Sequence, residues 1–355
     1  MENQHINFMP GPVNLHPEVK KIYYETFLSH RSSRFYEDVA AFEADLCKFV
    51  KAQNAAFFIG SGSLGNEVVA QYLKQLSGKG LILVNGEFGK RLTEQAKHID
   101  LSFDTFEIQL GEAFDYSKIN ALLASETYTW LWFVNCETSS GVLNDLTKLK
   151  VMCNRLGIKV AVDCISTIGN TDVNLDGVLI ASSTSGKGLA SYPGISIVFF
   201  EDTLLSLKTN SIPKYMNLKN HMDTNRVPYT VSTNLFYSLV HAFKGVSHPE
   251  HQKNIKIISD YIYGELANLG FSFLGNYEDM MPGIISIICP SEINSYDLGF
   301  ELERNNFFVN YGGSYLRKAN YFQICIMGHQ ELANAKKLVE FIRIKKLSQA
   351  LQTAS

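Results

Sequence analysis

A lysine between two apolar runs is the residue in this sequence best suited to covalent chemistry. Lys187 stands in the stretch Ser185-Gly-Lys-Gly188, between the β-branched runs 178–181 and 195–200, which we predict to be buried strands. The glycines leave room for a bulky group near the ε-amine, and a partly desolvated lysine loses its proton more readily than a solvated one. A lysine that forms a Schiff base needs both properties. Because a lysine beside glycine is also common in solvated turns, the interpretation depends on its partners.

An acid at the end of a third apolar run provides one partner. Asp163 closes the run Lys159-Val-Ala-Val-Asp163, which we predict to be a strand. A carboxylate in such a buried position is costly unless a cation faces it. A protonated pyridine nitrogen would serve, with Lys187 able to reach an aldehyde on the same ring. The two residues therefore indicate a site for a cofactor with a pyridine ring and an aldehyde.

Two glycine-containing turns at other strand ends suit the remaining parts of such a cofactor. The turn Gly60-Ser-Gly-Ser-Leu-Gly-Asn-Glu67 leads from a predicted strand into a helix, where exposed backbone N–H groups can hold a phosphate. It lacks the lysine of a P-loop, and an ordinary tight turn would explain it about as well. In Asn85-Gly-Glu-Phe-Gly-Lys-Arg91, Phe88 is either a plug of the core or a platform for a flat ring. Each motif is weak by itself, and their common placement at strand ends gives them weight.

Short apolar runs between residues 55 and 200 predict the sheet that positions these side chains. Most of them are continuous, not alternating, which is typical of a sheet covered on both faces. Helix-like segments such as 66–76 and 146–156 separate them, giving the order of a mainly parallel α/β sheet, whose ligands bind at the carboxyl ends of the strands. The seven candidate strands are 55–59, 81–85, 103–108, 130–135, 160–164, 178–181 and 195–200.

The rest of the chain divides into an arm and a smaller domain. Residues 1–16 contain Asn7-Phe-Met-Pro-Gly-Pro-Val13, whose prolines and glycine oppose regular structure, so we predict an extended arm. We expect residues 17–249 to form the large domain and residues 250–355 a smaller α+β domain. The elements predicted in the smaller domain are a helix at 254–269, strands at 284–288, 307–310 and 322–326, and a helix at 330–344.

Composition and charge place the function in a pocket. The 355 residues are 46% hydrophobic and 19% charged, an ordinary soluble composition that can bury a large core. A formal charge of −3 gives no general attraction to nucleic acid or to an anionic membrane. The start lacks the features of a signal peptide and no apolar run is long enough for a membrane span, so we expect a cytoplasmic protein. The six scattered cysteines predict buried free thiols, and no metal-ligand spacing is present.

Taken in order along nearly the whole chain, these motifs resemble the class V aminotransferases. These are fold-type I pyridoxal-phosphate enzymes that include phosphoserine, alanine–glyoxylate and aminoethylphosphonate transaminases. The resemblance implies a mainly parallel seven-stranded sheet with helices on both faces, a smaller C-terminal α+β domain, pyridoxal 5'-phosphate as cofactor, and a homodimer with shared active sites. The landmarks are Pro10-Gly-Pro, the turn 60–67, Gly86-Glu-Phe-Gly, Cys136-Glu-Thr-Ser-Ser-Gly-Val-Leu, Val162-Asp-Cys-Ile-Ser-Thr-Ile, Ser185-Gly-Lys-Gly, Pro193-Gly-Ile-Ser and Tyr229-Thr230.

The same resemblance implies a role for each site residue. Lys187 forms the Schiff base with the cofactor and Asp163 pairs with the ring nitrogen, so these two are the expected catalytic residues. Phe88 stacks on the ring, and Thr138 bonds the ring hydroxyl. The residues implied to hold the phosphate are Gly62 and Ser63 of the same chain and Tyr229 and Thr230 of a second subunit.

The substrate residues point toward one branch of the family. The stretch 28–35 is most similar to phosphoserine aminotransferases, in which a His-Arg pair faces the distal acidic group of the substrate. A solvated basic turn is the less favoured alternative. The resemblance implies substrate contacts for His30 and Arg31, and a second phosphate contact for Arg317. Gln323 stands where the family usually has an arginine for the substrate α-carboxylate, and an amide donates only neutral hydrogen bonds. We therefore expect a transaminase of the phosphoserine and 2-oxoglutarate type, with the choice of substrate left open by Gln323.

Other activities of the same fold are alternatives. They are an alanine–glyoxylate, serine–glyoxylate or aminoethylphosphonate-type transaminase, and a PLP lyase. The cysteine desulfurase version fits poorly, because Gly186 stands where those enzymes place a histidine and residues 311–321 contain no cysteine. A PLP-binding protein without turnover is the alternative from outside catalysis.

Overall fold

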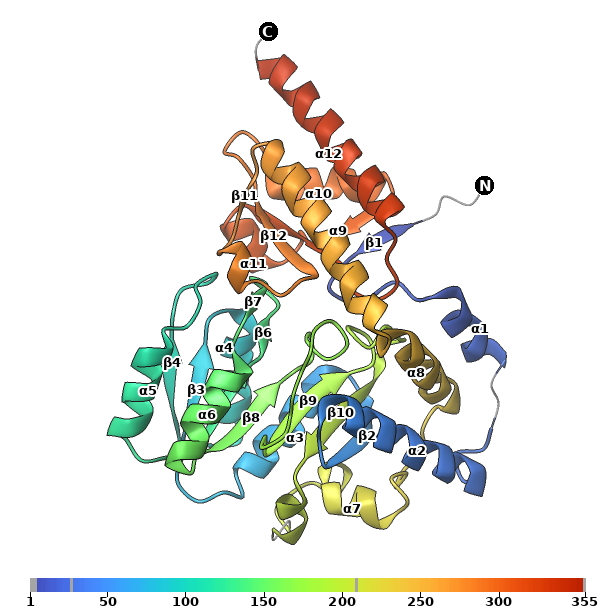
Figure 1. Cartoon of the computed structure of the whole chain (residues 1–355), viewed down its shortest axis with the longest axis vertical. Coiled ribbons are helices and arrows are strands. Elements are labelled where there is room, and N and C mark those ends of the chain that lie inside the picture. Colours follow the sequence, from blue (N-terminus) through green and yellow to red (C-terminus); the bar gives the residue numbers. More distant parts are fainter. Residues whose placement is uncertain (1–4, 26–27, 208–209, 354–355) are drawn as a thin grey trace.

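The computed structural model describes residues 5–25, 28–207 and 210–353 (Figure 1). The strands are β1 (Ile6–Phe8), β2 (Asn54–Gly60), β3 (Lys79–Val84), β4 (Phe103–Glu107), β5 (Tyr128–Val134), β6 (Cys136–Glu137), β7 (Val142–Leu143), β8 (Lys159–Asp163), β9 (Ile180–Thr184), β10 (Gly194–Phe200), β11 (Ser272–Phe273), β12 (Ile284–Ile288), β13 (Phe307–Val309) and β14 (Tyr321–Cys325). The helices are α1 (Pro17–Glu25), α2 (Ser33–Val50), α3 (Gly62–Leu73), α4 (Glu87–His98), α5 (Tyr116–Ser125), α6 (Leu146–Leu156), α7 (Leu218–Asp223), α8 (Thr233–Val246), α9 (Pro249–Asn268), α10 (Ser295–Arg304), α11 (Ser314–Lys318) and α12 (Leu332–Thr353).

The central sheet runs in the order β2-β10-β9-β8-β5-β3-β4. Its neighbouring strands are parallel except at β10, which pairs antiparallel with both β2 and β9. Each candidate strand of the sequence overlaps one strand of this sheet. The fold class expected from the sequence, a mainly parallel seven-stranded α/β sheet, is therefore confirmed.

Helices cover both faces of the sheet because its strands are apolar on both sides. One face packs against α2, α5, α6 and α8, and its core includes Phe57 and Phe133. The opposite face packs against α3, α4 and α7, and its core includes Phe58 and Trp132. Consecutive strand residues therefore enter different cores, as the alternation of side chains along a strand requires.

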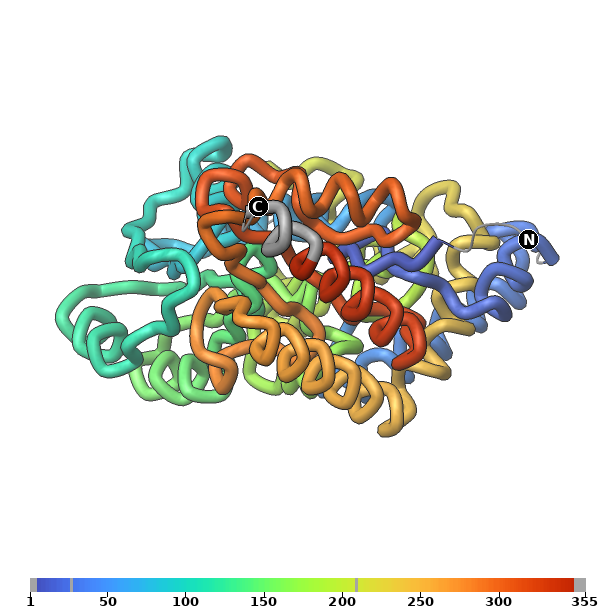
Figure 2. Tube along the Cα trace, turned by 90° about the horizontal axis from the view of Figure 1, so that it is seen from above, coloured from blue at the N-terminus to red at the C-terminus, as the bar shows by residue number. Residues whose placement is uncertain are grey.

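The chain from Pro249 onward, with β1, builds a second body that we call the C-terminal body (Figure 1). Its sheet β11-β12-β14 is antiparallel, and β1 pairs in parallel with β13. Figure 2 shows α9 and α12 side by side across the top of this body, with α12 in red. The division of the chain into an arm, a large domain and a small domain at residues 16 and 249 stays a proposal. The pairing of β1 with β13 attaches the arm to the C-terminal body.

Three of the differences from the sequence prediction concern β9, α3 and the arm. β9 continues past its predicted end to Thr184, because small hydroxyl side chains such as Ser182 can be buried when they find a hydrogen-bond partner. α3 begins at Gly62, four residues before the predicted start at Asn66, so the expected phosphate turn is the first turn of a helix. The arm, predicted without regular structure, contains the strand β1.

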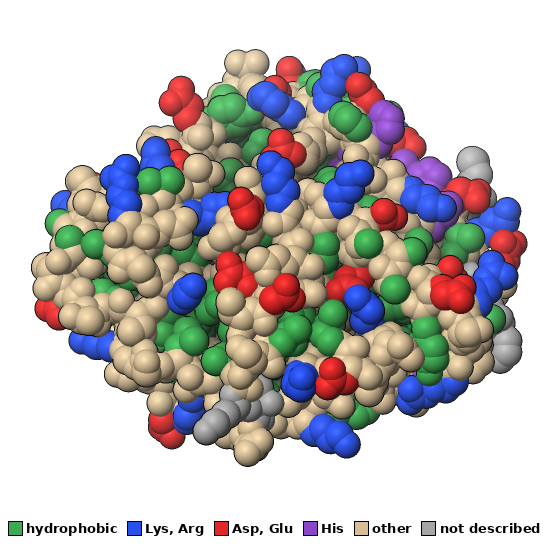
Figure 3. Space-filling model, turned by 60° about the horizontal axis from the view of Figure 1, so that its bottom comes forward, with side chains coloured by type: hydrophobic (Ala, Val, Ile, Leu, Met, Phe, Trp, Pro, Cys, Tyr) green, Lys and Arg blue, Asp and Glu red, His purple; other side chains and the backbone are tan. Residues whose placement is uncertain are grey.

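The surface carries no obvious charged patch on the face drawn in Figure 3, where basic and acidic side chains are interspersed. Across the described residues, no helix combines the length and the apolar character needed to cross a membrane. The same part of the chain holds no cluster of three or more histidine, cysteine or acidic side chains arranged for a metal ion.

Candidate active site

A cavity of about 320 Å³ lies at the carboxyl ends of β5, β8 and β9. This is the edge of the sheet to which the sequence assigned the chemistry. The structure brings six predicted site residues together around it: Gly62, Ser63, Phe88, Thr138, Asp163 and Lys187. Lining residues without a predicted role include Pro10, Gly11, Asn66, Arg91, Gln95, Ile165 and Ser166.

Lys187 lines the cavity from the loop that follows β9. Its Nζ donates a hydrogen bond to Ser166 Oγ at 3.2 Å and lies 5.2 Å from the ring centre of Phe88. Burial lowers the pKa of Lys187, and the attraction of Asp163 opposes this effect. The amine is therefore nearer to its neutral, nucleophilic form than the amine of an exposed lysine, as Schiff-base chemistry requires.

The N-terminal arm approaches Lys187 closely, which the sequence did not predict. Gly11 has a φ of 152°, and a Cβ placed on it would lie 3.3 Å from the carbonyl oxygen of Gly186 and 3.5 Å from Lys187 Cγ. Glycine is suited to this position because it tolerates both the backbone angle and the close approach.

Asp163 ends β8 as a carboxylate with two hydrogen bonds and no ion pair to any described residue. Its Oδ2 accepts from Asn66 Nδ2 at 2.7 Å, and its Oδ1 accepts from the backbone N–H of Ile165 at 2.9 Å. Ser182 Oγ in turn donates to Asn66 Oδ1 and fixes the orientation of that amide. Burial raises the pKa of Asp163, while these hydrogen bonds and the charge of Lys187 oppose the rise. A cation placed against this carboxylate would favour its ionised form.

Two hydroxyl groups stand next to the lysine. Thr138 Oγ1 and Ser166 Oγ are 2.5 Å apart, and Ser166 Oγ also accepts the hydrogen bond from Lys187 Nζ. Ser166 was not among the predicted site residues. Its only signal in the sequence is its place three residues after Asp163, within the landmark that begins at Val162.

The predicted phosphate turn opens α3. Its N-cap residue, Ser61, makes no side-chain hydrogen bond to the helix, so the first backbone N–H groups are not capped by a side chain. Gly62 packs against Ile165, and a Cβ on Gly62 would lie 2.7 Å from Ile165 Cδ1. Gln95 Nε2 donates to the carbonyl oxygen of Ser63 at 3.3 Å and ties α4 to this turn. A helix start of this kind suits an anion.

Phe88 is positioned by a buried carboxylate that the sequence analysis did not single out. Glu137 is fully buried, and its carboxylate accepts the backbone N–H groups of Phe88 and Gly89 at 3.0–3.2 Å. It also accepts the backbone N–H and the hydroxyl of Ser139. Because the N-cap residue Gly86 has no side chain, Glu137 replaces it as the cap of α4.

Four predicted site residues lie outside the cavity of their own chain: His30, Arg31, Tyr229 and Thr230. Arg31 is exposed, and its guanidinium donates to the carbonyl oxygen of Val227 at 2.9 Å. The segment with His30 and Arg31 is therefore attached to the segment with Tyr229 and Thr230. The two sets were predicted separately, and the structure places them together.

Arg317 also lies outside the cavity lining. Its Nε donates to the carbonyl oxygen of Gly312 at 3.0 Å, and its guanidinium carbon lies 4.6 Å from the ring centre of Tyr296. The hydrogen bond holds this side chain within its own loop of the C-terminal body.

Gln323 is fully buried and its amide is already satisfied. Its Nε2 contacts the carbonyl oxygens of Thr138 and Ser139 at 2.8 and 3.2 Å and Ser286 Oγ at 2.9 Å. Its Oε1 accepts from Asn310 Nδ2 at 2.7 Å. The side chain thus links β14 of the C-terminal body to the loop of Thr138, and it contributes no charge to the cavity.

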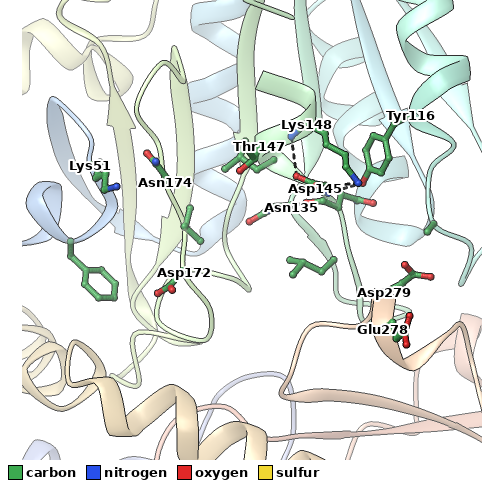
Figure 4. A pocket seen from close by; sticks show the side chains of 16 residues that line it. Lys51, Tyr116, Asn135, Asp145, Thr147, Lys148, Asp172, Asn174, Glu278 and Asp279 are labelled. Atoms are coloured by element: carbon green, nitrogen blue, oxygen red, sulfur yellow. Dashed lines mark hydrogen bonds and ion pairs between the residues drawn. The ribbon is translucent and has the colours of Figure 1, made fainter. Parts of the chain in front are cut away.

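A larger cavity of about 690 Å³ lies elsewhere, between the start of α6 and the residues Glu278 and Asp279 (Figure 4). Side chains of both signs line it, and Lys148 there pairs with Asp145 at 3.4 Å. None of the predicted site residues lines this cavity. The convergent hydroxyl, amine and carboxylate groups are found around Lys187, so the candidate active site is the smaller cavity.

Comparison with known proteins identifies the family. A protein-family model described as aminotransferase class V matches residues 22–317, which is most of the chain. The chain belongs to the class V aminotransferase family. Class V aminotransferases of fold type I use pyridoxal phosphate, so this protein is a PLP-dependent transaminase.

Individual relatives of this class V transaminase carry several specificities. The 2-aminoethylphosphonate–pyruvate transaminase of Pseudomonas aeruginosa strain UCBPP-PA14 is 27% identical over 298 residues, which cover 80% of each chain. An alanine–glyoxylate aminotransferase of Nostoc sp. has the same fold, with a TM-score of 0.88 at 22% identity over 95% of this chain and 93% of the other. A phosphoserine aminotransferase of Cytophaga hutchinsonii has a TM-score of 0.83 at 19% identity, over 97% and 99% of the two chains.

The residues of the cavity fit the cofactor of a class V transaminase. Asp163 is a buried carboxylate without an ion pair among the described residues, which suits a protonated pyridine nitrogen. The uncapped start of α3 suits a phosphate, and Lys187 offers a half-buried amine with a lowered pKa to an aldehyde. A cavity of about 320 Å³ has the size of a small-molecule site.

Proposed function

We propose that this transaminase moves the amino group of a small amine with a phosphonate or related acidic group to a 2-oxo acid, in the manner of an aminoethylphosphonate–pyruvate transaminase. The observation that supports this choice is Gln323, whose amide is taken up by protein contacts and cannot replace a carboxylate-binding arginine. Aminoethylphosphonate has no α-carboxylate, so a donor of this type does not need that arginine, and only the 2-oxo acid acceptor brings a carboxylate next to its reacting carbon. The P. aeruginosa relative bears the same activity in its name.

The side chains of the cavity divide the chemistry among them. Bound pyridoxal phosphate supplies an aldehyde that accepts the amino group and a ring that stores the electron pair left on the substrate carbon. Lys187 takes and returns the substrate proton at Nζ, and Ser166 Oγ orients that atom. Asp163 keeps a positive charge at the pyridine nitrogen, and Asn66 holds the Asp163 carboxylate in place. Phe88 covers one side of the site and keeps water out.

The first expectation, a phosphoserine-type transaminase, is the second candidate. It rests on the pair His30 and Arg31, which suits a distal phosphate. In the structure the Arg31 guanidinium donates to the carbonyl oxygen of Val227. Val227 is next to Tyr229 and Thr230, which we propose below to enter the active site of a second subunit. This arrangement would carry Arg31 toward that site together with Tyr229.

A screen of amino donors tests the proposal. The holoenzyme is mixed with aminoethylphosphonate, phosphoserine, glutamate or alanine without an acceptor, and the cofactor absorbance is followed. We expect aminoethylphosphonate to convert the cofactor to its amine form fastest, and pyruvate to restore it. Faster conversion by phosphoserine, restored by 2-oxoglutarate, would favour the second candidate. A donor that is consumed while the cofactor absorbance returns without acceptor would indicate a lyase.

We also propose a homodimer in which Tyr229 and Thr230 complete the phosphate site of the partner. The apolar side chains of Ile59 and Tyr215 are exposed on a single chain, as expected for surfaces that a second subunit covers. Light scattering should give the mass of two chains, and Thr230→Ala should retain less cofactor after gel filtration. A monomer with full cofactor occupancy would contradict this assembly.

A further inference from the structure

Arg91 is a cation of the cavity that has no assigned role. It lies on α4, one turn after Phe88, and its guanidinium carbon is 4.6 Å from the centre of the Phe88 ring. Within the described residues its side chain forms no hydrogen bond and no ion pair. The ring supports the guanidinium, and the N–H edge stays available for a ligand.

The other cations considered for the substrate are engaged elsewhere. Arg31 donates to Val227, and Arg317 donates to Gly312. Gln323 carries no charge, and its amide is consumed by neighbouring groups. Among the described residues that line the cavity, the cationic side chains are Lys187, which the cofactor requires, and Arg91.

The charge of Arg91 acts on titratable groups of two different elements. Burial is the main cause of the lowered pKa of Lys187, and the charge of Arg91 acts in the same direction. Burial raises the pKa of Tyr315 on α11, and the charge of Arg91 opposes that rise. Arg91 is thus within electrostatic range of the reactive amine and of the C-terminal body.

We propose that Arg91 binds the acidic group of the amine substrate and determines the specificity of the enzyme for it. This inference rests on the proposed function. The ligand chemistry is an oxyanion, either a phosphonate or a carboxylate, which a guanidinium can hold with two parallel hydrogen bonds. The competing role is a contact to the cofactor phosphate, because Gln95, one turn further along α4, bonds Ser63 of the phosphate turn.

Equilibrium binding of an unreactive probe tests Arg91 without turnover. Ethylphosphonate, which has the acidic group and no amine, is titrated into the holoenzyme by calorimetry, and propionate is the carboxylate arm. Arg91→Gln should weaken ethylphosphonate binding roughly ten- to hundredfold, and Arg91→Lys should weaken it less. Lys90→Gln is the matched control, because it removes the same charge from the neighbouring position, where the ammonium pairs with Glu107 at 3.5 Å. A larger loss for propionate than for ethylphosphonate would assign the site to carboxylate substrates.

Kinetics on two amines that differ only in the acidic group give the second readout. Arg91→Gln should lower the ratio of kcat/KM for aminoethylphosphonate to that for ethylamine by roughly the same factor as probe binding. Unchanged probe affinity in Arg91→Gln would overturn the inference. The inference would also fail if Arg91→Gln lost cofactor while its remaining holoenzyme bound ethylphosphonate normally, because that result assigns Arg91 to the cofactor phosphate. If the wild-type holoenzyme transfers no amino group from any donor, the proposed function fails, whereas the probe titration still reports on Arg91.

Discussion

Lys187 is the residue on which the cofactor assignment can be tested directly. Its half-buried amine, with a pKa lowered by desolvation, is the expected point of covalent attachment. Borohydride reduction followed by peptide mapping should place the pyridoxyl group on Lys187. Lys187→Ala should bind the cofactor without a reducible bond and lose activity by several orders of magnitude. Lys90→Ala should retain the reducible bond and the activity. A pyridoxyl group on another lysine would remove the basis of the site.

Local order in the sequence explains which site residues could be predicted. Asp163 ends a strand that is visible as an apolar run, and Lys187 and Thr138 come after two others. Strand ends of a parallel sheet meet at one edge. Ser166 and Arg91 line the same cavity, yet their residue types do not separate them from ordinary loop and helix residues, and Ser166 has only its place shortly after Asp163 as a signal. Their significance depends on which neighbours face them, and that is decided by tertiary packing.

The capping of α4 links one strand end to Phe88, the residue expected to stack on the cofactor ring. A Cβ on Gly86 would lie 2.5 Å from Glu137 Cγ and Cδ, so Gly86→Ala should displace the carboxylate from the helix start. We expect a loss of about 1 to 3 kcal/mol in stability and weaker cofactor retention, because Phe88 shifts. Thermal unfolding and cofactor release measure the two effects. Gly245→Ala is the control, since a Cβ there meets nothing within 4 Å. Equal behaviour of the two variants would show that Glu137 does not hold α4.

The sheet of the C-terminal body clamps the loop that carries Thr138. Besides Gln323, Tyr321 donates to the carbonyl oxygen of Ser139 and Ser286 donates to that of Ser140. Gln323→Leu leaves buried polar groups unpaired and should cost about 2 to 5 kcal/mol. Urea unfolding of the apoprotein measures the loss, and Gln109→Leu at an exposed position is the control. A stability equal to that of the control would mean that the amide contacts contribute little.

The elements themselves were predictable where the apolar pattern is strong, and less so where polar residues are buried. β12 has the bounds that the sequence indicates. β9 does not, since Ser182 and Thr184 look like loop residues until Asn66 and the carbonyl of Ile195 are seen to bond their hydroxyls. β1 was missed because it is short and its partner, β13, lies at the other end of the chain.

The whole molecule should lose stability in mild acid. Burial lowers the pKa of His221 and of His251 to about 4, from 6.5. Between these values the unfolded chain takes up protons that the folded chain does not, so stability falls as the pH drops from 6.5 toward 4. At pH 5 each histidine should cost about 2 kcal/mol relative to pH 7. Urea unfolding at both pH values should show this loss, and His221→Phe should reduce it. His98→Gln, an exposed control, should leave it unchanged. A loss that is the same in all three proteins would assign the acid effect to other groups.

β1 leaves the ribosome well before its partner strand β13, which follows about 300 residues later. At a synthesis rate of about 5 to 20 residues per second, the first strand waits roughly 15 to 60 s. During that interval Phe8, fully buried in the finished protein, has no core to enter. The C-terminal body is therefore completed only after the residues of the large sheet have already emerged.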